Sequence, residues 1–416
     1  MITLVEALNY RCLRYARRRL DSFHVLVGPN ASGKTTFMDV IGFMGDLASN
    51  GLEHALTERS SIPDQLLFRG QGDKFELAVE ATVPQNLREL TIKPELDAVR
   101  YEVGIGLDDT GRQFEIKAER LLLKRVEQVA PLQRELFPMS MNWPDSLLTQ
   151  IPGSKVVIKK VPNGNDNFYS ETKPPKSRWA PSFKLGPQRS ALRNLVDDEH
   201  SFPVATWFRN HLTSGIQHVA LNSFAMRRPS PPTRISGFLP DGSNLPWVVA
   251  RLRKEQPERY REWIDHLRTA LPNLTGITTI ERPEDKHCYL VYEYADGLKV
   301  RSWLVSDGTL RLTALTLPAY LGDLEGIYLI EEPENGIHPK AVSTVFDSLS
   351  SVYGAQVLLA THSPVVLNLA NLEQVLCFAK DGAGATDIVV GTEHPALRQW
   401  QGDVDLGTLL ASGVLE

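Results

Sequence analysis

Short, continuously apolar runs mark candidates for buried strands in two distant parts of the chain. The run HVLV at 24–27 precedes a glycine-rich turn and a helical pattern that begins at Lys34. Much later, helical and apolar stretches alternate in the order helix 308–321, strand 327–330, helix 339–351 and strand 356–360. Strands that are apolar on both faces and alternate with helices are typical of a parallel sheet with both faces covered. The chain is therefore predicted to contain an α/β core.

Alternating apolar and polar positions mark a second kind of structure. The segments KFELAVEATV, RYEVGIGL and RQFEIKAERLLL follow one another between residues 74 and 123, and CYLVYEY and LKVRSWLV fall between 288 and 305. A period of two is typical of strands with one buried face, joined in antiparallel pairs. We therefore expect an antiparallel sheet beside the parallel core.

Residues 244–271 carry apolar positions at helical spacing, and Pro257 is placed to open a second helix. The aromatic residues Trp247, Tyr260 and Trp263 are expected to pack between helices rather than to stack on nucleic-acid bases. This stretch therefore predicts a helical lobe.

Residues 151–190 show no sustained period and are rich in Pro, Gly, Asn, Ser and Lys, which predicts a mobile loop or linker. Basic residues outnumber the acidic Asp166 and Glu171, namely Lys155, Lys159, Lys160, Lys173, Lys176, Arg178, Lys184 and Arg189. Two interpretations stay open for this loop: a solvated surface segment, or a contact with nucleic acid or a partner protein.

These patterns divide the chain into three parts. Residues 1–125 and 235–416 are expected to form two halves of one α/β unit, the first with the glycine-rich turn and antiparallel sheet, the second with the helical lobe. Residues 126–234 are expected to form a mixed, partly helical insertion that carries the basic loop.

Composition narrows the class of protein. The chain has 416 residues, a formal net charge of -5 and a sequence pI near 6.1, which argues against a uniformly basic nucleic-acid coat. Its three scattered cysteines, Cys12, Cys288 and Cys377, provide neither a disulfide framework nor a CxxC metal site. No signal peptide and no apolar stretch of about 18 residues is evident. We expect a soluble, cytoplasmic protein without a membrane contact.

The turn after the first apolar run satisfies the pattern G-x-x-x-x-G-K-[ST], in the strand-to-helix context that gives this pattern meaning. Gly28 and Gly33 allow backbone amides to surround phosphate oxygens at the N-terminus of a helix. Lys34 is expected to bridge the β- and γ-phosphates of a nucleotide, and the Thr35 hydroxyl to bind Mg²⁺.

Two adjacent acids, Glu331 and Glu332, end the apolar run IYLI, at the edge of the sheet where α/β proteins bind ligands. Glu331 is expected to hold the Mg²⁺ shell, and Glu332 to orient or deprotonate the attacking water. The following strand ends at THSP, so His362 should reach the same edge and donate a hydrogen bond to the γ-phosphate. Ser363 is placed either for this site or simply to cap the next helix.

The segment VSDGT at 305–309 precedes a helical run and supplies a second helix N-terminus that could bind phosphate through Ser306 and the amides of Gly308 and Thr309. The first glycine-rich turn already serves one nucleotide. The second turn is therefore free either to serve the nucleotide of another molecule or to act as an ordinary helix cap.

Taken together and in this order, GPNASGKT, VSDGT, EEPENGIHP and THSP resemble the motifs of the ABC-type ATPases of the SMC, RecF and OLD group. The resemblance covers roughly residues 1–70 and 235–416 and includes FLPDGSNL at 238–245. It implies an ATPase head that binds ATP and Mg²⁺, with Lys34, Glu332 and His362 catalytic and Thr35 and Glu331 at the metal. The nucleotide-binding residues that it implies are Asn30, Ala31, Ser32, Gly33, Lys34, Thr35, Thr36, Ser306 and Gly308.

The resemblance also implies a homodimer, or a higher even oligomer. In it the Walker residues of one head, which are Lys34 and Thr35 of the glycine-rich turn and Glu331 and Glu332 of the acid pair, would face, together with His362 of the same head, Ser306 and Gly308 of another head. A D-loop is implied at Glu334, Asn335 and Gly336. Glu331 stands where many relatives have Asp, and Asp307 replaces the first glycine of the usual signature, as in the OLD-like branch. Gln65 and Gln71 are both candidates for the glutamine that senses Mg²⁺.

OLD proteins carry a Toprim nuclease domain after the ATPase, and the roughly fifty residues after THSP are expected to be too few for one. Asp403-Val404-Asp405 imitates a Toprim acid pair without its sheet. We therefore expect an ATPase subunit of a bacterial anti-phage defence system, resembling those of Septu and PARIS, that controls a separately encoded effector of the nuclease class. The alternative is a RecF-like or SMC-like repair or chromosome-maintenance clamp on duplex DNA, with Arg227, Arg228 and Arg234 as phosphate contacts.

Overall fold

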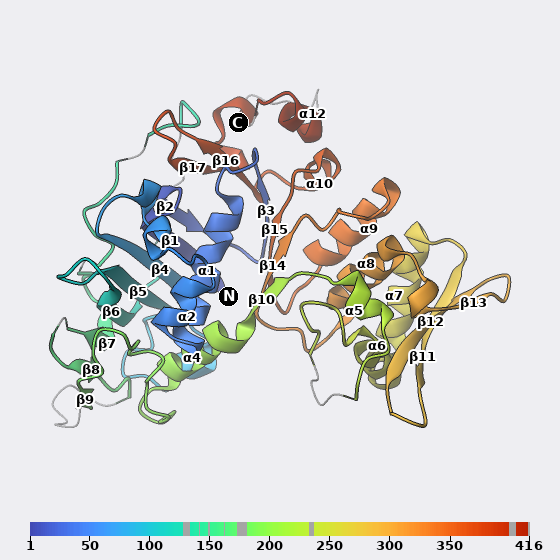
Figure 1. Cartoon of the computed structure of the whole chain (residues 1–416), viewed down its shortest axis with the longest axis horizontal. Coiled ribbons are helices and arrows are strands. Elements are labelled where there is room, and N and C mark those ends of the chain that lie inside the picture. The colour runs from blue at the N-terminus through green and yellow to red at the C-terminus, as the bar shows by residue number, and fades with distance from the viewer. Residues whose placement is uncertain are drawn as a thin grey trace.

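The computed structural model describes residues 1–127, 134–140, 142–148, 150–161, 163–172, 181–232, 237–398 and 405–414. A central, mostly parallel sheet lies between a large antiparallel sheet on one side and a lobe of helices with a small sheet on the other (Figure 1). The α/β fold class and the antiparallel sheet beside the core are thus confirmed.

The central sheet is built from strands that are far apart in the sequence. Its order is β10 (Ile216–Val219), β14 (Ile327–Glu331), β15 (Gln356–Ala360), β3 (Phe23–Val27), β16 (Val375–Lys380) and β17 (Thr386–Val390). All neighbours are parallel except the last pair, β16 and β17. The continuous apolar runs predicted β3, β14 and β15, whereas β10, β16 and β17 were not predicted.

Both faces of this sheet are buried, as a continuous apolar run requires. On one face Leu26, Leu329 and Leu358 belong to the core that contains helix α1 (Lys34–Ser49) and the antiparallel sheet. Their chain neighbours, including Val25 and Ile330, point the other way into the core of the helical lobe. The sheet is therefore shared by two hydrophobic cores, and its edges position the loops that follow each strand.

The antiparallel sheet has the order β2 (Leu13–Arg19), β1 (Ile2–Tyr10), β4 (Lys74–Thr82), β5 (Ala98–Leu107), β6 (Phe114–Lys124), β7 (Lys155–Lys160), β8 (Asp166–Phe168) and β9 (Ser182–Phe183). Strands β4 to β6 match the alternating segments. The expectation of irregular structure throughout 151–190 is wrong for β7, β8 and β9. The segment KVVIKK, three apolar residues flanked by lysines, pairs with β6 even though its surroundings have the composition of a loop.

The helical lobe holds α5 (Ser223–Arg227), α6 (Leu245–Glu255), α7 (Pro257–Ala270), α8 (Asp307–Thr316) and α9 (Pro339–Ser350), with the small sheet β11 (Leu274–Glu281), β12 (Cys288–Tyr294) and β13 (Lys299–Arg301). Pro257 opens α7, as predicted. Trp263 is fully buried and its indole N–H donates to Thr316 Oγ1 at 3.0 Å, while Tyr260 donates to the Ile277 carbonyl at 2.8 Å. Both aromatic residues therefore pack and bond within the lobe.

The remaining helices are short except for one. They are α2 (Leu52–Thr57), α3 (Gln85–Arg88), α4 (Pro203–Gly215), α10 (Pro364–Leu369), α11 (Pro395–Arg398) and α12 (Leu406–Ala411). Helix α4 packs against α1 and leads directly into β10. Residues 126–234 thus add strands to the antiparallel sheet and one edge strand to the central sheet.

Several sequence expectations concern the C-terminal part and the cysteines. Asp405 caps α12 by accepting from the Thr408 amide at 2.7 Å, whereas Asp403 lies outside the described residues. Cys12, Cys288 and Cys377 are all free thiols. Over the described part of the chain, every helix is too short or too polar to cross a membrane.

Candidate nucleotide site

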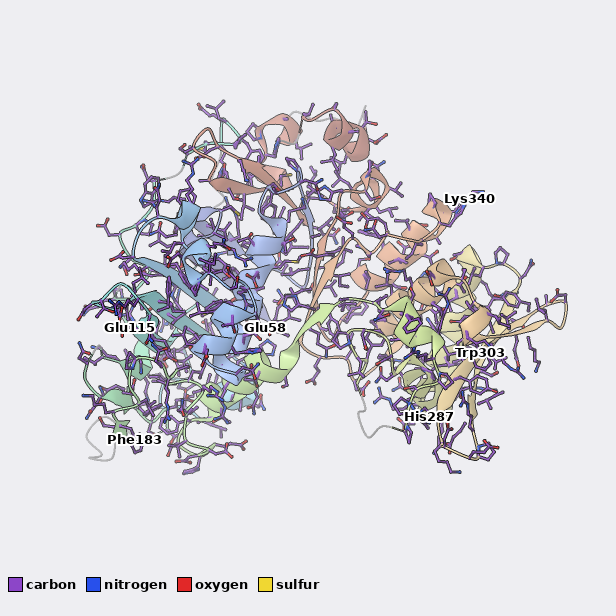
Figure 2. All side chains as sticks on the ribbon, viewed as in Figure 1. Glu58, Glu115, Phe183, His287, Trp303 and Lys340 are labelled. Carbon is purple, nitrogen blue, oxygen red and sulfur yellow. The ribbon has the colours of Figure 1, made fainter. Side chains whose placement is uncertain are left out.

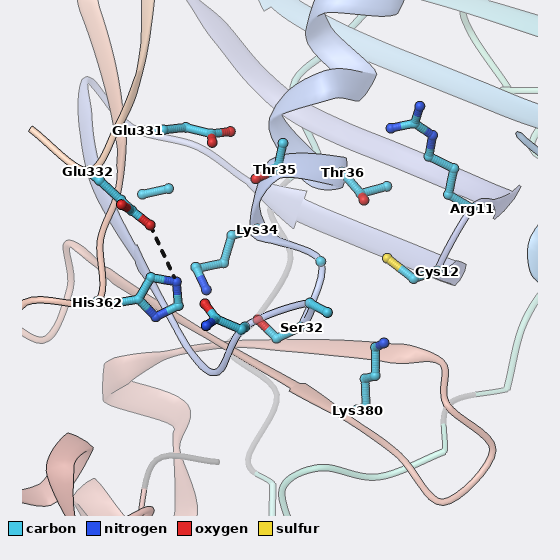
Figure 3. Close-up of a pocket in the computed structure, with 14 residues that line it drawn as sticks. Arg11, Cys12, Ser32, Lys34, Thr35, Thr36, Glu331, Glu332, His362 and Lys380 are labelled. Carbon is cyan, nitrogen blue, oxygen red and sulfur yellow. Dashed lines mark ion pairs between the residues drawn. The ribbon is translucent and has the colours of Figure 1, made fainter. Parts of the chain in front are cut away.

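A cavity of about 400 Å³ opens where β3, β14 and β15 end (Figure 3). Because parallel strands end at one edge of the sheet, residues from sequence positions near 30, 330 and 360 meet there. The lining residues are Arg11, Cys12, Asn30, Ala31, Ser32, Gly33, Lys34, Thr35, Thr36, Glu331, Glu332, Ala360, His362 and Lys380. The cavity thus unites the glycine-rich turn, the acid pair and the histidine.

The glycine-rich turn is fixed by close contacts that only glycine permits. Gly28 has φ 146°, and a Cβ there would lie 2.1 Å from the Phe378 carbonyl oxygen on β16. Gly33 has φ 109°, and its Cβ would lie 2.5 Å from Thr386 Oγ1, which itself donates to the Ser32 carbonyl at 2.8 Å. The turn is therefore held against β16 and β17 at the cavity that it lines.

The turn has the chemistry of an anion site. Lys34 is buried, and its ammonium donates to the carbonyls of Gly28 and Pro29 at 2.7 and 2.9 Å. Ser32 Oγ is also buried and has no hydrogen-bond partner among the described residues. Helix α1 begins at Lys34 and has no acidic residue in its first turn, so its positive dipole end is uncompensated. A phosphate group would satisfy each of these donors.

The acid pair differs in backbone conformation. Glu331 is the exposed last residue of β14, whereas Glu332 has φ 46°, a left-handed conformation that is strained for a non-glycine residue. The Glu332 amide still donates to the Ala360 carbonyl at 2.8 Å. The Glu332 side chain lines the cavity, and its carboxylate accepts from Asn335 Nδ2.

His362 faces Glu332 across the cavity (Figure 3). Its Nε2 lies 3.9 Å from Glu332 Oε1. Thr361, the residue before it, makes two hydrogen bonds that fix the turn. Its amide donates to the Leu26 carbonyl at 3.1 Å, and its hydroxyl donates to Glu334. Ser363 accepts from the Val366 amide at 3.4 Å and so caps α10. His362, rather than Ser363, is the group that this turn presents to the cavity.

The 305–309 turn lies outside the cavity of its own chain. Ser306 caps α8 by accepting from the Thr309 amide at 3.2 Å, and neither Ser306 nor Gly308 lines the cavity. Instead, Gly308 packs on the implied D-loop, since a Cβ at this position would lie 2.7 Å from the Gly336 carbonyl oxygen. Ser306 itself is exposed. The structure therefore does not bring together these residues and the cavity within one chain.

A second hollow, of about 780 Å³, adjoins the first and shares Arg11, Cys12 and Lys380 with it. Gln65 lines this second hollow with Phe68 and Arg69, whereas Gln71 lines neither space. The sequence motifs missed Arg11, Cys12 and Lys380. Arg11 and Cys12 form the turn between β1 and β2, where Arg11 has φ 51°, and Lys380 ends β16.

A titratable group that no motif marks lies on β10, the strand next to the acid-bearing β14. Burial lowers the pKa of His218, although Asp39 acts in the opposite direction. His218 is therefore expected to be neutral at pH 7 and to contribute no charge beside Glu331.

The basic residues proposed for a DNA clamp are largely engaged within the chain. Arg227 pairs with Asp307 at 2.7 Å, and the Arg228 guanidinium lies 4.0 Å from the Phe224 ring centroid. In the basic loop, Lys160 forms a buried pair with Asp166 at 2.7 Å, and Lys155 donates to the Glu171 carbonyl. Arg234, Lys173, Lys176 and Arg178 lie outside the described residues.

Mg²⁺ commonly binds through one or two protein oxygens together with phosphate oxygens and water. Among the described residues, no group of three or more His, Cys, Asp or Glu side chains is arranged to hold a metal ion. Thr35 and Glu331, which face each other across the cavity in Figure 3, are the protein groups that fit such a shared site.

Comparison with known proteins gives a family and a fold. The family model described as "AAA domain, putative AbiEii toxin, Type IV TA system" matches residues 23–368. No curated protein matches the chain. A crystal structure of an Smc head bound to the C-winged helix domain of ScpA aligns over 93% of this chain and 97% of its own, with 17% identity and a TM-score of 0.53.

A second solved structure agrees with the first. The Smc head domain with an extended coiled coil, bound to the C-terminal domain of ScpA and derived from Pyrococcus furiosus, aligns over 93% of this chain and 95% of its own. The identity is 14% and the TM-score 0.52. At such identities the likeness shows the fold, which is that of an SMC head.

Proposed function

The chain belongs to the AAA-domain family whose model spans residues 23–368, and from this we propose that it is an ATP hydrolase whose site is completed by a second copy of the chain. One observation carries the proposal. The glycine-rich turn, the acid pair and His362 reach a single cavity from three neighbouring parallel strands. An anion-binding turn beside two carboxylates provides the groups needed to bind a triphosphate and to activate water for hydrolysis of a phosphoanhydride.

The residues of one chain divide the chemistry. The turn amides and Lys34 bind and orient the triphosphate, and Lys34 neutralises charge that develops on the β- and γ-phosphates. Glu332, turned into the cavity, accepts the proton of the attacking water, while His362 donates to a γ-phosphate oxygen. Thr35 and Glu331 would hold Mg²⁺, which supplies further neutralisation of phosphate charge when it is bound.

The second copy supplies what the cavity of one chain lacks. Ser306 and the amides of Gly308 and Thr309 form an exposed helix N-terminus on the lobe, away from their own cavity. We place this turn against the nucleotide held by the partner's glycine-rich turn. Binding of ATP by one copy would then favour association of two heads, and hydrolysis would weaken it.

Ser306→Arg is expected to leave ATP binding by the single chain intact and to abolish turnover, because a long cation in this turn would clash across the interface. Titration with a fluorescent ATP analogue and a phosphate-release assay separate the two effects. Ser351→Arg, at the exposed residue that caps the C-terminus of α9, is a matched control that should hydrolyse ATP normally. A Ser306→Arg protein with an unchanged hydrolysis rate would contradict the composite site.

The second hollow fits the nucleoside end of the nucleotide. The phosphate cavity ends at Thr36, Arg11 and Cys12, and the hollow opens from the last two of these. Half-buried Phe68 lines it and gives the hollow an aromatic ring, over which the guanidinium groups of Arg14 and Arg69 lie at 5.4 and 5.7 Å from the centroid. We therefore place the base and ribose in this hollow.

Phe68→Ala is expected to weaken ATP binding by about 5- to 150-fold, since stacking on an aromatic ring contributes about 1–3 kcal/mol per base. Binding of inorganic tripolyphosphate, which has no base, should not change, and Phe68→Trp should retain ATP affinity. Calorimetric titration with both ligands measures the difference. Equal losses for ATP and tripolyphosphate would remove Phe68 from the nucleoside site.

We further propose that the ATP cycle controls a separately encoded effector protein of the nuclease class in bacterial anti-phage defence. The resemblance of the motifs to OLD-like heads supports this role, as does a family description that refers to a toxin–antitoxin system. Purification of the chain from its native host should bring down the effector as a second polypeptide. Cleavage of DNA or RNA by the purified chain alone would contradict the proposal.

A further inference from the structure

The 305–309 turn is useful to a second copy only if it is held in one conformation. We propose that Arg227 is the positioning residue that holds it, an inference that rests on the proposed composite site. Arg227 belongs to α5, 78 residues before the turn in the sequence, and no motif includes it.

The guanidinium of Arg227 binds the turn at two points. Its Nε and Nη2 donate to the Val305 carbonyl at 3.3 and 3.0 Å, and Nη2 lies 2.7 Å from Asp307 Oδ1. These two residues flank Ser306 on either side. The Ser302 hydroxyl donates back to the Arg227 carbonyl at 3.2 Å. The end of α5 and the 302–307 segment are therefore held together by hydrogen bonds donated from each of them to the other.

Helix α5 in turn is anchored to the strand beside the catalytic acids. Its Met226 is fully buried, and Asn222 caps it by accepting from the amides of Phe224 and Ala225 at 3.0 and 3.1 Å. Asn222 follows β10, whose last residue, Val219, pairs with Ile330 immediately before Glu331. Arg227 thus connects the edge of one chain's nucleotide cavity with the turn that serves the other chain's nucleotide.

The surroundings of the turn are those of a contact surface. Leu304 is 72% exposed and Phe224 is 63% exposed, and both are large apolar residues that border the Arg227 contacts. Trp303, labelled on the lobe in Figure 2, is exposed as well. Apolar side chains gathered in this way favour burial against another protein surface. A second copy of the chain, docked through Ser306, would cover them.

The Arg227–Asp307 pair is better suited to position the turn than to stabilise the fold. The two side chains are 34% and 54% exposed. Exposed pairs contribute little to folding stability, whereas a small displacement of a group that contacts a reacting phosphate lowers the rate strongly. Replacement of Arg227 should therefore change catalysis while leaving the melting temperature of the protein nearly unchanged.

Arg227→Ala is expected to bind ATP with unchanged affinity and to hydrolyse it about 10- to 100-fold more slowly. Arg227→Lys should be intermediate, because an ammonium cannot bind the carbonyl and the carboxylate with the geometry of a guanidinium. Arg251→Ala, which removes an Arg–Asp pair of similar exposure on α6, is the matched control and should be fully active. Phosphate release, nucleotide titration and thermal melting are the measurements.

Mixing with Lys34→Ala provides the decisive readout. A heterodimer of Arg227→Ala and Lys34→Ala contains one complete site, with the Walker residues of the first chain and the 305–309 turn of the second. Hydrolysis should therefore rise above that of either variant alone. A mixture of Glu332→Gln and Lys34→Ala should stay inactive. Both substitutions affect the residues that bind the nucleotide within one chain, so neither site of the heterodimer is complete.

The outcomes separate this inference from the proposed function. Full hydrolysis by Arg227→Ala, or no recovery in its mixture with Lys34→Ala although Ser306→Arg blocks turnover, would overturn the role of Arg227 alone. Failure of Ser306→Arg to block turnover would instead overturn the composite site itself.

Discussion

A Glu332→Gln protein is expected to bind ATP, to hydrolyse it about 10²- to 10⁴-fold more slowly and to accumulate as a closed dimer. Glutamine preserves the shape of the side chain and its hydrogen bond with Asn335, yet it cannot accept a proton from water. The nucleotide therefore stays intact between the two heads. Light scattering after size exclusion, with and without ATP and Mg²⁺, measures the dimer.

The control for this substitution lies at the opposite end of the same strand. Glu325 is exposed and precedes β14, so Glu325→Gln changes the same charge away from the cavity. It should hydrolyse ATP and dissociate normally. A Glu332→Gln protein that hydrolyses ATP at the original rate and remains monomeric would remove Glu332 from the role of general base.

Lys34→Ala is expected to weaken ATP binding by about 30- to 4,000-fold. Loss of one partner from a buried charged contact costs about 2–5 kcal/mol, and each 1.4 kcal/mol corresponds to a factor of ten in Kd. Calorimetric titration measures the loss. Lys340→Ala, at the exposed start of α9 and labelled in Figure 2, replaces a lysine that does not line the cavity and should bind ATP normally.

Nearly unchanged ATP affinity in Lys34→Ala would mean that the ammonium does not face the triphosphate. It would then serve only the carbonyls of Gly28 and Pro29, which it contacts in this structure. Circular dichroism of the variant would show whether the turn and α1 remain folded.

The meeting of the glycine-rich turn, the acid pair and His362 in one cavity could be predicted because their signals are local. Lys34 follows its strand within a few residues, and Glu332 and His362 each follow an apolar run directly. A single rule, that parallel strands end at one edge, was then enough to bring them together. The assembly of the parallel sheet from both halves of the chain follows from the same reasoning.

The rest of the site depends on contacts between distant segments that carry no motif. Thr386 fixes the glycine-rich turn from 354 residues away, and Lys380 reaches the cavity from β16, which was not predicted. From the sequence Arg227 was a candidate contact to DNA phosphates, whereas in the structure it pairs with Asp307 of the 305–309 turn. Strand β7 could not be predicted because the residues around it have the composition of a loop. Its strand conformation depends on pairing with β6.

The structure of the Glu332→Gln protein with ATP and Mg²⁺ tests the central claim most directly. We predict two chains with Ser306 Oγ of one within hydrogen-bond distance of the γ-phosphate that Lys34 of the other binds. A triphosphate enclosed by residues of one chain only, with the 305–309 turn remote from every neighbouring nucleotide, would contradict the account.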